Sequence, residues 1–306
     1  MIPANVFRRK LHALKNQGET RIHAGLHKTG STSLQNSLRV AGILQSSSRS
    51  DFRDPVKFQA TLSEAGSHNR VVSSEHLLAE MYDMYSTAPE RIELITNYVE
   101  RSEITLYLKP HPEWHASAYS QLVQQGTLTD CVAYQERVES SRYFSWSRLA
   151  RDLLNAGGSS TRIRVRAAQN VVRDYAKVLR VPLPRSTRKN SSLSPMALEA
   201  LVRLGQETSI PWEVARRGLQ NFMPESRLTT SVLSREFQSR LLEMREDWLQ
   251  LTGIINAETQ VISGSWETSY LQGIRAPARD IFSGRDLKAA EEHIRLVIPD
   301  WQKTRG

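Results

Sequence analysis

The sequence predicts an α/β protein in which a parallel β-sheet is flanked by helices, with a largely helical C-terminal part. Two observations predict this fold class. Short apolar runs alternate with helix-period segments through the first half of the chain, an order typical of a parallel sheet covered by helices on both faces. From Asn170 onward the apolar spacing is helical, apart from residues 257–285. The 306 residues suffice for one large domain with its own core, or for such a domain with a helical appendage.

The individual elements follow from these patterns. Strands are predicted at residues 20–24, 70–74, 104–108 and 162–166, and helices between them at 31–45, 87–100, 112–125 and 144–156. Further helices are predicted at 170–179, 195–206, 209–219, 234–252 and 286–297, whereas residues 257–285 indicate irregular or extended structure. We therefore expect an N-terminal extension at 1–19, a main domain at 20–255 and a C-terminal extension at 256–306 whose role the sequence does not indicate.

The first strand–helix junction carries the most informative motif, Gly25-Leu26-His27-Lys28-Thr29-Gly30-Ser31-Thr32-Ser33. A turn that leads from a strand into a helix directs backbone N–H groups and the positive end of the helix at one point, where an anion can bind. Gly25 and Gly30 allow the tight bend and the close approach of a ligand. The simpler alternative is a turn in which Ser31 or Ser33 only caps the helix.

The position of the lysine argues against an ordinary nucleotide triphosphatase. In the Walker loop, four residues separate two glycines, and the second glycine is followed directly by lysine. Here Ser31 occupies that position, and Lys28 lies two residues before Gly30. A lysine set back in this way would lie beside the atom that bridges the first phosphate to the group being transferred. The loop therefore suits a donor with one phosphate and one transferable group.

A second segment begins with the β-rich run at 104–108, which ends at Lys109. Prolines and then a helix follow, with Ser117 eight residues after Lys109. By itself, a lysine at a strand end followed by a serine on a helix is a common arrangement.

Together the loop and this segment resemble the sulfotransferases that use 3′-phosphoadenosine 5′-phosphosulfate (PAPS), above all the bacterial carbohydrate-type and general sulfotransferase-domain members. The resemblance covers about residues 20–205 and implies a P-loop-type parallel sheet. It implies that Lys28 acts on the bridging oxygen of the donor, and that the 5′-phosphate is held by Thr29, Gly30, Ser31, Thr32 and Ser33. The product of the donor would be 3′,5′-ADP, and no metal is expected.

The resemblance also implies that Lys109 and Ser117 bind the donor's 3′-phosphate. The family has arginine where this chain has Lys109, so a point charge replaces a planar, two-pronged donor and orients the phosphate less tightly. Related enzymes bring basic residues of a later loop to the same phosphate, and Arg188 and Lys189 are the candidates here. The alternative for these two residues is a solvated basic connector.

A third segment places Glu75 just past the end of the predicted strand at 70–74, at the edge where open α/β sheets bind ligands. Sulfuryl transfer needs a base that takes the proton of the acceptor hydroxyl. The resemblance to bacterial and protein-modifying sulfotransferases implies Glu75 as this base, with His76 as the alternative. Glu75 could instead only stabilise a helix N-terminus through the helix dipole.

Composition excludes few classes of protein. The chain has 41 basic and 32 acidic residues, a net charge of +9 and a pI near 9.8, but the basic residues are scattered, so nucleic acid is not the expected partner. The single Cys131 allows no internal disulfide and is typical of a reducing compartment. His111 and His115 are four residues apart, but no third metal ligand is visible nearby. No apolar run reaches the roughly 20 residues of a membrane span, and we expect a cytoplasmic protein.

The sequence thus predicts a PAPS-dependent sulfotransferase that acts on an acceptor hydroxyl, for which the resemblance favours a carbohydrate. One alternative is a P-loop small-molecule kinase, although the Walker lysine that it would need is missing. The other is a non-catalytic relative that binds PAPS or a glycan, which the lysine at position 109 leaves open. The identity of the acceptor and the oligomeric state are not predicted.

Overall fold

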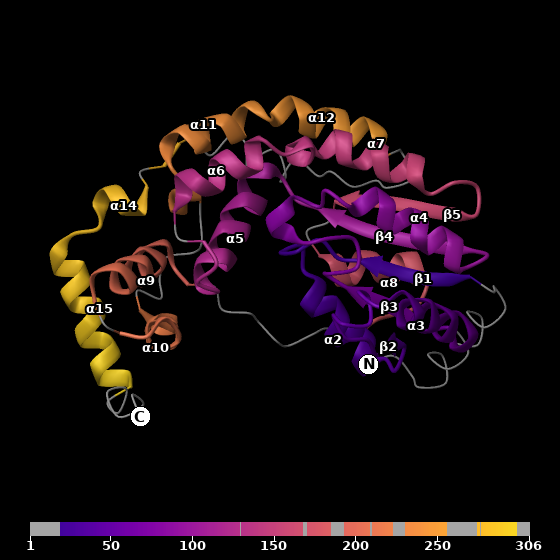
Figure 1. Cartoon of the computed structure of the whole chain (residues 1–306), viewed down its shortest axis with the longest axis horizontal. Coiled ribbons are helices and arrows are strands. Elements are labelled where there is room, and N and C mark those ends of the chain that lie inside the picture. The colour runs from indigo at the N-terminus through magenta and orange to yellow at the C-terminus, as the bar shows by residue number, and fades with distance from the viewer. Residues whose placement is uncertain are drawn as a thin grey trace. The chain divides into compact units, whose positions relative to one another are not determined.

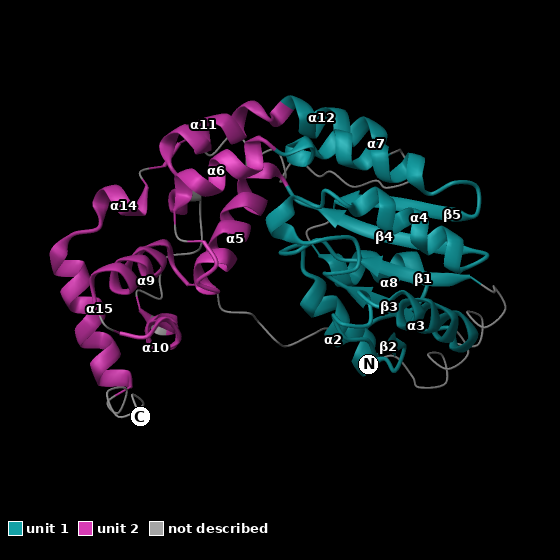
Figure 2. Cartoon of the chain, in the orientation of Figure 1, with its two compact units in different colours: residues 1–109, 141–189, 246–263 teal, residues 110–140, 190–245, 264–306 magenta. Residues whose placement is uncertain are grey.

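The computed structural model describes residues 19–128, 130–167, 170–184, 193–208, 210–222, 230–255, 274–275 and 277–298. It confirms the predicted fold class, because an all-parallel sheet is flanked by helices and the C-terminal part is helical (Figure 1). The chain forms two compact units, which we describe separately (Figure 2). The first comprises residues 1–109, 141–189 and 246–263, and the second residues 110–140, 190–245 and 264–306.

The first unit contains a five-stranded sheet. Its strands are β1 (Thr20–Ala24), β2 (Leu44–Gln45), β3 (Val71–Ser74), β4 (Ser102–Leu108) and β5 (Thr161–Ala167). Their spatial order is β2-β3-β1-β4-β5, and every neighbouring pair is parallel. The central strand β1 aligns Ile22 with Val72 of β3 and with Ile104 of β4. All residues of these three strands are buried, as expected for a parallel sheet that is covered on both faces.

Helices cover both faces of this sheet. They are α2 (Ser31–Val40), α3 (Pro55–His68), α4 (Ala88–Tyr98), α7 (Trp146–Ala156) and α8 (Val171–Leu179), with short 3₁₀ turns at Met81–Asp83 and Arg142–Phe144. Helix α2 packs on α8, whereas α3 packs on α4 and α4 on α7. Neighbouring side chains of a strand point to opposite faces. Ile22 and His23 are both 0% exposed, so neither face of the central strand meets solvent.

A buried polar network fixes α8 to the sheet. Asp174 of α8 accepts hydrogen bonds from the Tyr107 hydroxyl of β4 at 2.8 Å and from the Arg166 guanidinium of β5 at 2.8 Å. Apolar side chains around it, among them Leu34 of α2 and Tyr175 of α8, form one core cluster. The network therefore joins α8 to both β4 and β5 through charged and polar groups that are largely shielded from solvent.

The second unit is helical. It contains α5 (His111–Gln124), α6 (Cys131–Glu139), α9 (Pro195–Glu207), α10 (Trp212–Gly218), α11 (Arg235–Glu243), α14 (Ala278–Ile281), α15 (Gly284–Val297) and 3₁₀ turns at Leu219–Asn221 and Thr230–Val232. Helix α9 packs on α5, α10 and α15. His115 lies among aromatic rings, with Nδ1 2.9 Å from the Tyr134 hydroxyl and its ring 5.4 Å from that of Phe237. None of the described helices has the length and apolar character needed to cross a membrane.

Several predicted boundaries were wrong. The helix predicted at 31–45 ends at Val40, because Gly42 adopts a left-handed conformation with φ of 70° and β2 follows. The helix predicted at 234–252 is two helices, α11 and α12 (Arg245–Ile254), which meet at Met244. Strand β2 and helices α3 and α6 were not predicted. Most of the segment predicted to be irregular, 257–285, lies outside the described residues, and α14 falls within its remainder.

Candidate functional site

Three of the predicted site residues follow the carboxyl ends of adjacent strands. Lys28 lies in the loop after β1, Glu75 directly follows β3, and Lys109 directly follows β4. The strand order reverses at β1, because β3 lies on one side of it and the next strand of the chain, β4, lies on the other. In open α/β sheets, ligands bind beyond the carboxyl ends of strands at such a reversal.

The loop between β1 and α2 is tightly folded. The Gly25 amide donates to the Ser74 carbonyl at 3.1 Å, which ties the start of the loop to the end of β3. The Thr29 hydroxyl donates to the Leu26 carbonyl at 2.6 Å and closes the turn from inside. A Cβ atom at Gly25 would lie 2.2 Å from Ser31 Oγ, so only glycine fits there. The loop therefore requires glycine for close packing as well as for flexibility.

Lys28 has a left-handed backbone conformation with φ of 66°. Residues other than glycine adopt this region rarely, and such strained positions concentrate at functional sites. Gly30 follows with φ of 95° and starts helix α2. These two left-handed residues lie two positions apart, in the segment that the sequence predicts to be a phosphate-binding loop.

Helix α2 begins without a capping side chain. Its N-cap is Gly30, which makes no side-chain hydrogen bond to the first amides, and the first turn has no acidic residue. By contrast, Asp54 caps α3 and Ser145 caps α7. The first amides of a helix have no partner within the helix and carry its positive end. Ser31 is buried and Thr32 and Ser33 are half-buried at this end, where an anion would be held.

The charges at the strand ends interact. Burial lowers the pKa of Lys28, Lys109 lowers it further by repulsion, and Glu75 opposes both effects. The two ammonium groups and the single carboxylate are therefore close enough to influence one another, and all three residues are half-buried. Two positive charges against one negative charge leave an excess that favours an anionic ligand.

Glu75 has the properties of a base. Burial raises the pKa of its carboxyl group above the ordinary 4.5, and the charge of Lys28 and a hydrogen bond from Ser31 reduce that rise. A carboxylate with a raised pKa accepts a proton more readily near neutral pH. The carboxyl group thus lies at the strand end and has a raised pKa, and its role as a base stays a prediction.

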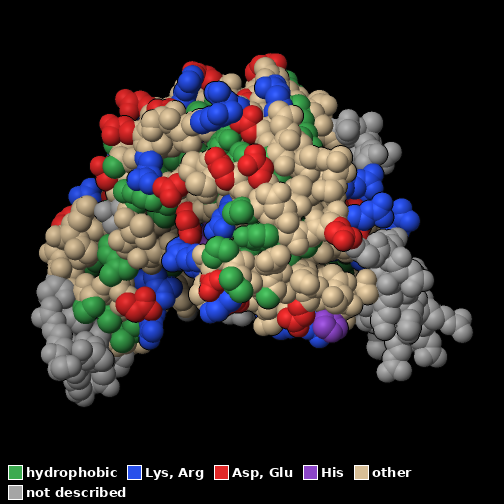
Figure 3. All heavy atoms as spheres, turned by 45° about the vertical axis from the view of Figure 1, so that its right-hand side comes forward, with side chains coloured by type: hydrophobic (Ala, Val, Ile, Leu, Met, Phe, Trp, Pro, Cys, Tyr) green, Lys and Arg blue, Asp and Glu red, His purple; other side chains and the backbone are tan. Residues whose placement is uncertain are grey.

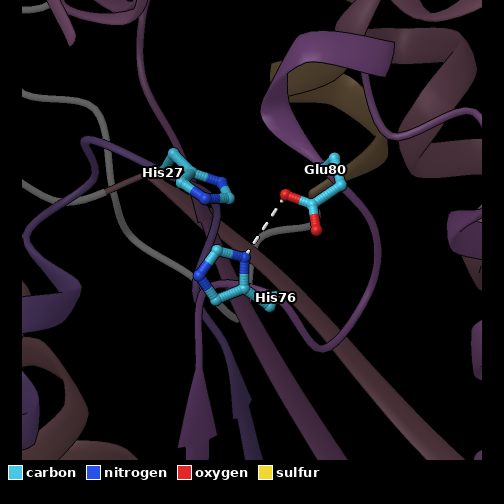
Figure 4. Close-up of side chains that lie close together, drawn as sticks. All are labelled: His27, His76 and Glu80. Atoms are coloured by element: carbon cyan, nitrogen blue, oxygen red, sulfur yellow. Dashed lines mark ion pairs between the residues drawn. The ribbon is translucent and has the colours of Figure 1, made fainter. Parts of the chain in front are cut away.

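His76, the alternative base, makes different contacts. Its amide donates to the Ser74 hydroxyl at 3.1 Å, and its Nδ1 lies 3.4 Å from a Glu80 oxygen. Figure 4 shows this approach and the His27 ring beside it, with ring centroids 5.1 Å apart. His76 is therefore paired with Glu80, whereas Glu75 interacts with Lys28 and Ser31.

His27, His76 and Glu80 form a group in which the possible ligand atoms lie within 4.8 Å of one another. The Glu80 carboxylate is already close to two guanidinium groups, because it pairs with Arg49 and lies 3.6 Å from Arg53. Positive charge of this density opposes a divalent cation. We interpret the group as a support, in which Glu80 joins the segment after β2 to the segment after β3.

Two buried histidines help to hold the loop in place, one in the loop itself and one in β1. The His27 amide donates to the Tyr85 hydroxyl at 2.9 Å, and burial together with repulsion from His76 lowers the pKa of the imidazole to about 4. His23 Nδ1 lies 2.8 Å from the Ser73 hydroxyl, and burial lowers its pKa to about 3. Both rings are therefore neutral near pH 7 and act as hydrogen-bonding and packing groups.

The remaining predicted residues are not joined to this site by the structure. Ser117 is half-buried on α5 of the second unit, while Lys109 belongs to the first unit. Arg188 and Lys189 lie outside the described residues. The assignment of these three residues to a 3′-phosphate site stays a prediction.

Sequence reasoning missed a cavity of about 570 Å³ within the first unit. Glu75 and His76 line it, together with Thr32 and Gln35 of α2 and three arginines, Arg39, Arg49 and Arg70. No role was predicted for Trp146, whose indole donates to the Lys109 carbonyl at 3.0 Å and so holds the end of β4. No pattern in the sequence identified the arginines, because they gather only when β2 pairs with β3.

In comparisons with known proteins, no family model, no curated protein and no solved structure matches the chain. The functional proposal below therefore rests on the residues of this chain, their geometry and the motif resemblance.

Proposed function

We propose that the protein is a PAPS-dependent sulfotransferase, which moves a sulfuryl group from the donor to an acceptor hydroxyl. One observation carries this proposal: Lys28 of a glycine-bounded loop interacts with Glu75 and Lys109 at the carboxyl ends of β1, β3 and β4. The uncapped first turn of α2 lies directly after this loop. An anion-binding loop with an adjacent cation and base contains the groups that sulfuryl transfer needs.

The loop would hold the 5′-phosphate of the donor. The fit is supported by Gly25, where a Cβ atom would collide with Ser31 Oγ, and by the first turn of α2, which no side chain of the described residues caps. Thr29, Gly30 and Ser31 would contribute amides and hydroxyls, and Thr32 and Ser33 would extend the contact along the helix. The helix dipole favours the negative charge of the phosphate at this point.

Glu75 and Lys28 would carry out the transfer from opposite sides of the sulfur. Glu75 would take the proton of the acceptor hydroxyl as its oxygen forms a bond to sulfur. The bond from sulfur to the bridging phosphate oxygen breaks at the same time, and Lys28 would stabilise the negative charge that develops on that oxygen. Stabilisation of developing charge is commonly the largest contribution to such a rate.

Lys109 would supply charge to the 3′-phosphate. Lys109 lowers the pKa of Lys28, which supports placing both ammonium groups at the same edge of the sheet. The hydrogen bond from the Trp146 indole to the Lys109 carbonyl fixes the backbone there. Ser117, Arg188 and Lys189 are proposed as further ligands of that phosphate. A single ammonium group orients a phosphate less tightly than a guanidinium group does, so we expect donor affinity to depend on these partners.

A carbohydrate hydroxyl is the proposed acceptor, and the cytoplasm the proposed location. The buried, free thiol of Cys131 fits a reducing compartment. On the face drawn in Figure 3, Lys and Arg side chains are interspersed with Asp and Glu side chains. Such mixing differs from the continuous basic stripe of a nucleic-acid-binding surface, so we propose no nucleic-acid partner.

A radiolabel transfer assay tests the proposal. The purified chain is incubated with ³⁵S-labelled PAPS and a panel of mono- and oligosaccharides, and products are identified by a mass increase of one sulfuryl group. A thermal-shift comparison of 3′,5′-ADP with ATP–Mg²⁺ separates this activity from a small-molecule kinase. Stabilisation by 3′,5′-ADP without transfer to any acceptor would instead indicate a non-catalytic binding protein.

A further inference from the structure

The cavity beside Glu75 is polar along its whole length. Its walls are the side of α2 that carries Thr32 and Arg39, the paired strands β2 and β3, and residues 46–49. Among the described residues that line it, Leu44 is the only apolar side chain, and the others include hydroxyl, amide and charged groups. Sites for drug-like or steroid-like ligands are lined mainly by apolar and aromatic side chains. This cavity therefore suits a ligand rich in hydroxyl groups.

Its charge is predominantly positive. Arg39, Arg49 and Arg70 line it, with Glu75 as the acidic lining residue. Arg49 is paired with Glu80, so Arg39 and Arg70 carry the excess charge. Arg39 donates to the amide oxygen of Asn36 at 2.7 Å, so its strongest contact is with a neutral group. Arg70 donates to Gln45 Oε1 at 3.4 Å and lies 3.9 Å from Glu64, which is half exposed. Ion pairs of such length and exposure are weak, so both charges can still attract an anion.

The charges and the proposed base lie at different ends of the cavity. Thr32 is in the first turn of α2, and Arg39 is seven residues later, which is about 10 Å along the helix axis. On the strand side, Arg70 precedes β3 and Glu75 follows it. These backbone separations exceed the width of a single sugar ring. The spacing instead suits an oligosaccharide with its reacting hydroxyl at Glu75 and an anionic group on another ring.

The strand order separates this cavity from the proposed nucleotide position. Lys109 follows β4, on one side of β1, whereas the cavity lies along β3 and β2, on the other side. The proposed 3′-phosphate ligand and the three arginines are thus on opposite sides of the phosphate-binding loop. A donor held by the loop and by Lys109 would leave the cavity to the acceptor.

We propose that this cavity binds an acidic oligosaccharide, one that already carries a sulfate or carboxylate group, with Arg39 and Arg70 holding that group away from the reacting hydroxyl. This inference rests on the proposed sulfotransferase function, since it assigns the acceptor side of that site. Hydrogen bonds from guanidinium to sulfate or carboxylate are among the stronger polar contacts in proteins.

Equilibrium binding to the full chain tests the inference. A sulfated chondroitin tetrasaccharide is the acidic probe and chitotetraose the neutral one, each measured by calorimetry at fixed ionic strength. We expect tighter binding of the acidic probe, weakened about tenfold in the double variant Arg39→Gln/Arg70→Gln. The matched control is Arg148→Gln, an exposed arginine of α7 in the same unit, which should leave binding unchanged.

Binding of 3′,5′-ADP to the same samples separates the two proposals. If 3′,5′-ADP binds but the acidic and neutral probes bind equally, or the double variant binds as wild type does, the acceptor inference is overturned and the donor assignment stands. Competition between the acidic probe and 3′,5′-ADP would also overturn it, because the cavity would then belong to the donor. If the acidic probe binds as expected and 3′,5′-ADP does not, the cavity assignment stands and the sulfotransferase proposal fails.

Discussion

Lys28 and Glu75, 47 positions apart in the sequence, influence each other's pKa in opposite directions at the ends of neighbouring strands. The carboxylate favours the charged ammonium, and the ammonium favours the ionised carboxylate, while burial opposes both charges. A pair of this kind keeps a cation and a base ready at one site near neutral pH. The predictions below test what this pair does and what supports it.

The pH dependence of transfer identifies the base. Because the pKa of Glu75 is raised above 4.5, kcat/KM should fall with decreasing pH along an acid limb placed above that value. Glu75→Gln should lower turnover by about 10²–10⁴-fold and remove this limb. His76→Gln should retain the limb. An acid limb that vanishes in His76→Gln and persists in Glu75→Gln would assign the base to the histidine.

Gly25→Ala tests the packing of the loop. The new methyl group would lie 2.2 Å from Ser31 Oγ and 2.9 Å from His23 Cε1, and such overpacking costs about 1–3 kcal/mol. We expect lower stability to urea and weaker binding of 3′,5′-ADP. Gly253→Ala is the control, because nothing lies within 4 Å of its Cβ position in helix α12, and it should be neutral or stabilising. Unchanged 3′,5′-ADP affinity in Gly25→Ala would show that the loop does not bind the donor.

His23 should make stability pH-dependent. Its pKa is about 3 in the folded chain and 6.5 when exposed, so between these values the unfolded state holds a proton that the folded state lacks. The free energy of unfolding should therefore fall by about 1.4 kcal/mol for each pH unit below 6.5 on account of this group. The free energy of unfolding is measured by urea titration at several pH values. Its slope against pH should differ by that amount between wild type and His23→Gln. His68→Gln, at an exposed position of α3, is the control; equal slopes in wild type and His23→Gln would contradict the buried, neutral ring.

Asp174→Ala should destabilise the first unit strongly. It removes the acceptor for Arg166 and Tyr107, whose side chains are buried between β4, β5 and α8. Breaking such a pair leaves an uncompensated charge and costs about 3–5 kcal/mol. Chemical denaturation measures the loss, and Glu64→Ala is the comparison, because Glu64 is half exposed and lies 3.9 Å from Arg70, so its removal should cost under about 1 kcal/mol. Similar losses in the two variants would show that the network contributes little.

The sequence predicted the parts of the fold that have strong local signals. Strands β1, β3, β4 and β5 are buried or alternating runs, and helix α9 starts with a serine cap and a proline. Strand β2 has two residues, and it forms because Leu44 and Gln45 pair with β3, which is a tertiary effect. Helices α3 and α6 were overlooked although aspartates cap both.

The part of the site that lies at the strand ends could be predicted from the sequence. Glu75 and Lys109 follow apolar runs, and the carboxyl ends of parallel strands share one edge of the sheet, so their approach to Lys28 follows from topology. The arginines of the cavity could not be predicted in this way. Arg39 is on a helix and Arg70 precedes a strand, and only the pairing of β2 with β3 brings them to one cavity.

The measurement that tests the central claim most directly is the turnover of Lys28→Ala with labelled PAPS, taken together with its affinity for 3′,5′-ADP. If Lys28 stabilises the departing phosphate oxygen, turnover should fall by about 10²–10³-fold while 3′,5′-ADP still binds and the variant stays folded. Lys57→Ala, at an exposed position of α3, should match wild type. Turnover that survives the loss of Lys28, or a variant that loses its fold instead of its turnover, would contradict the account.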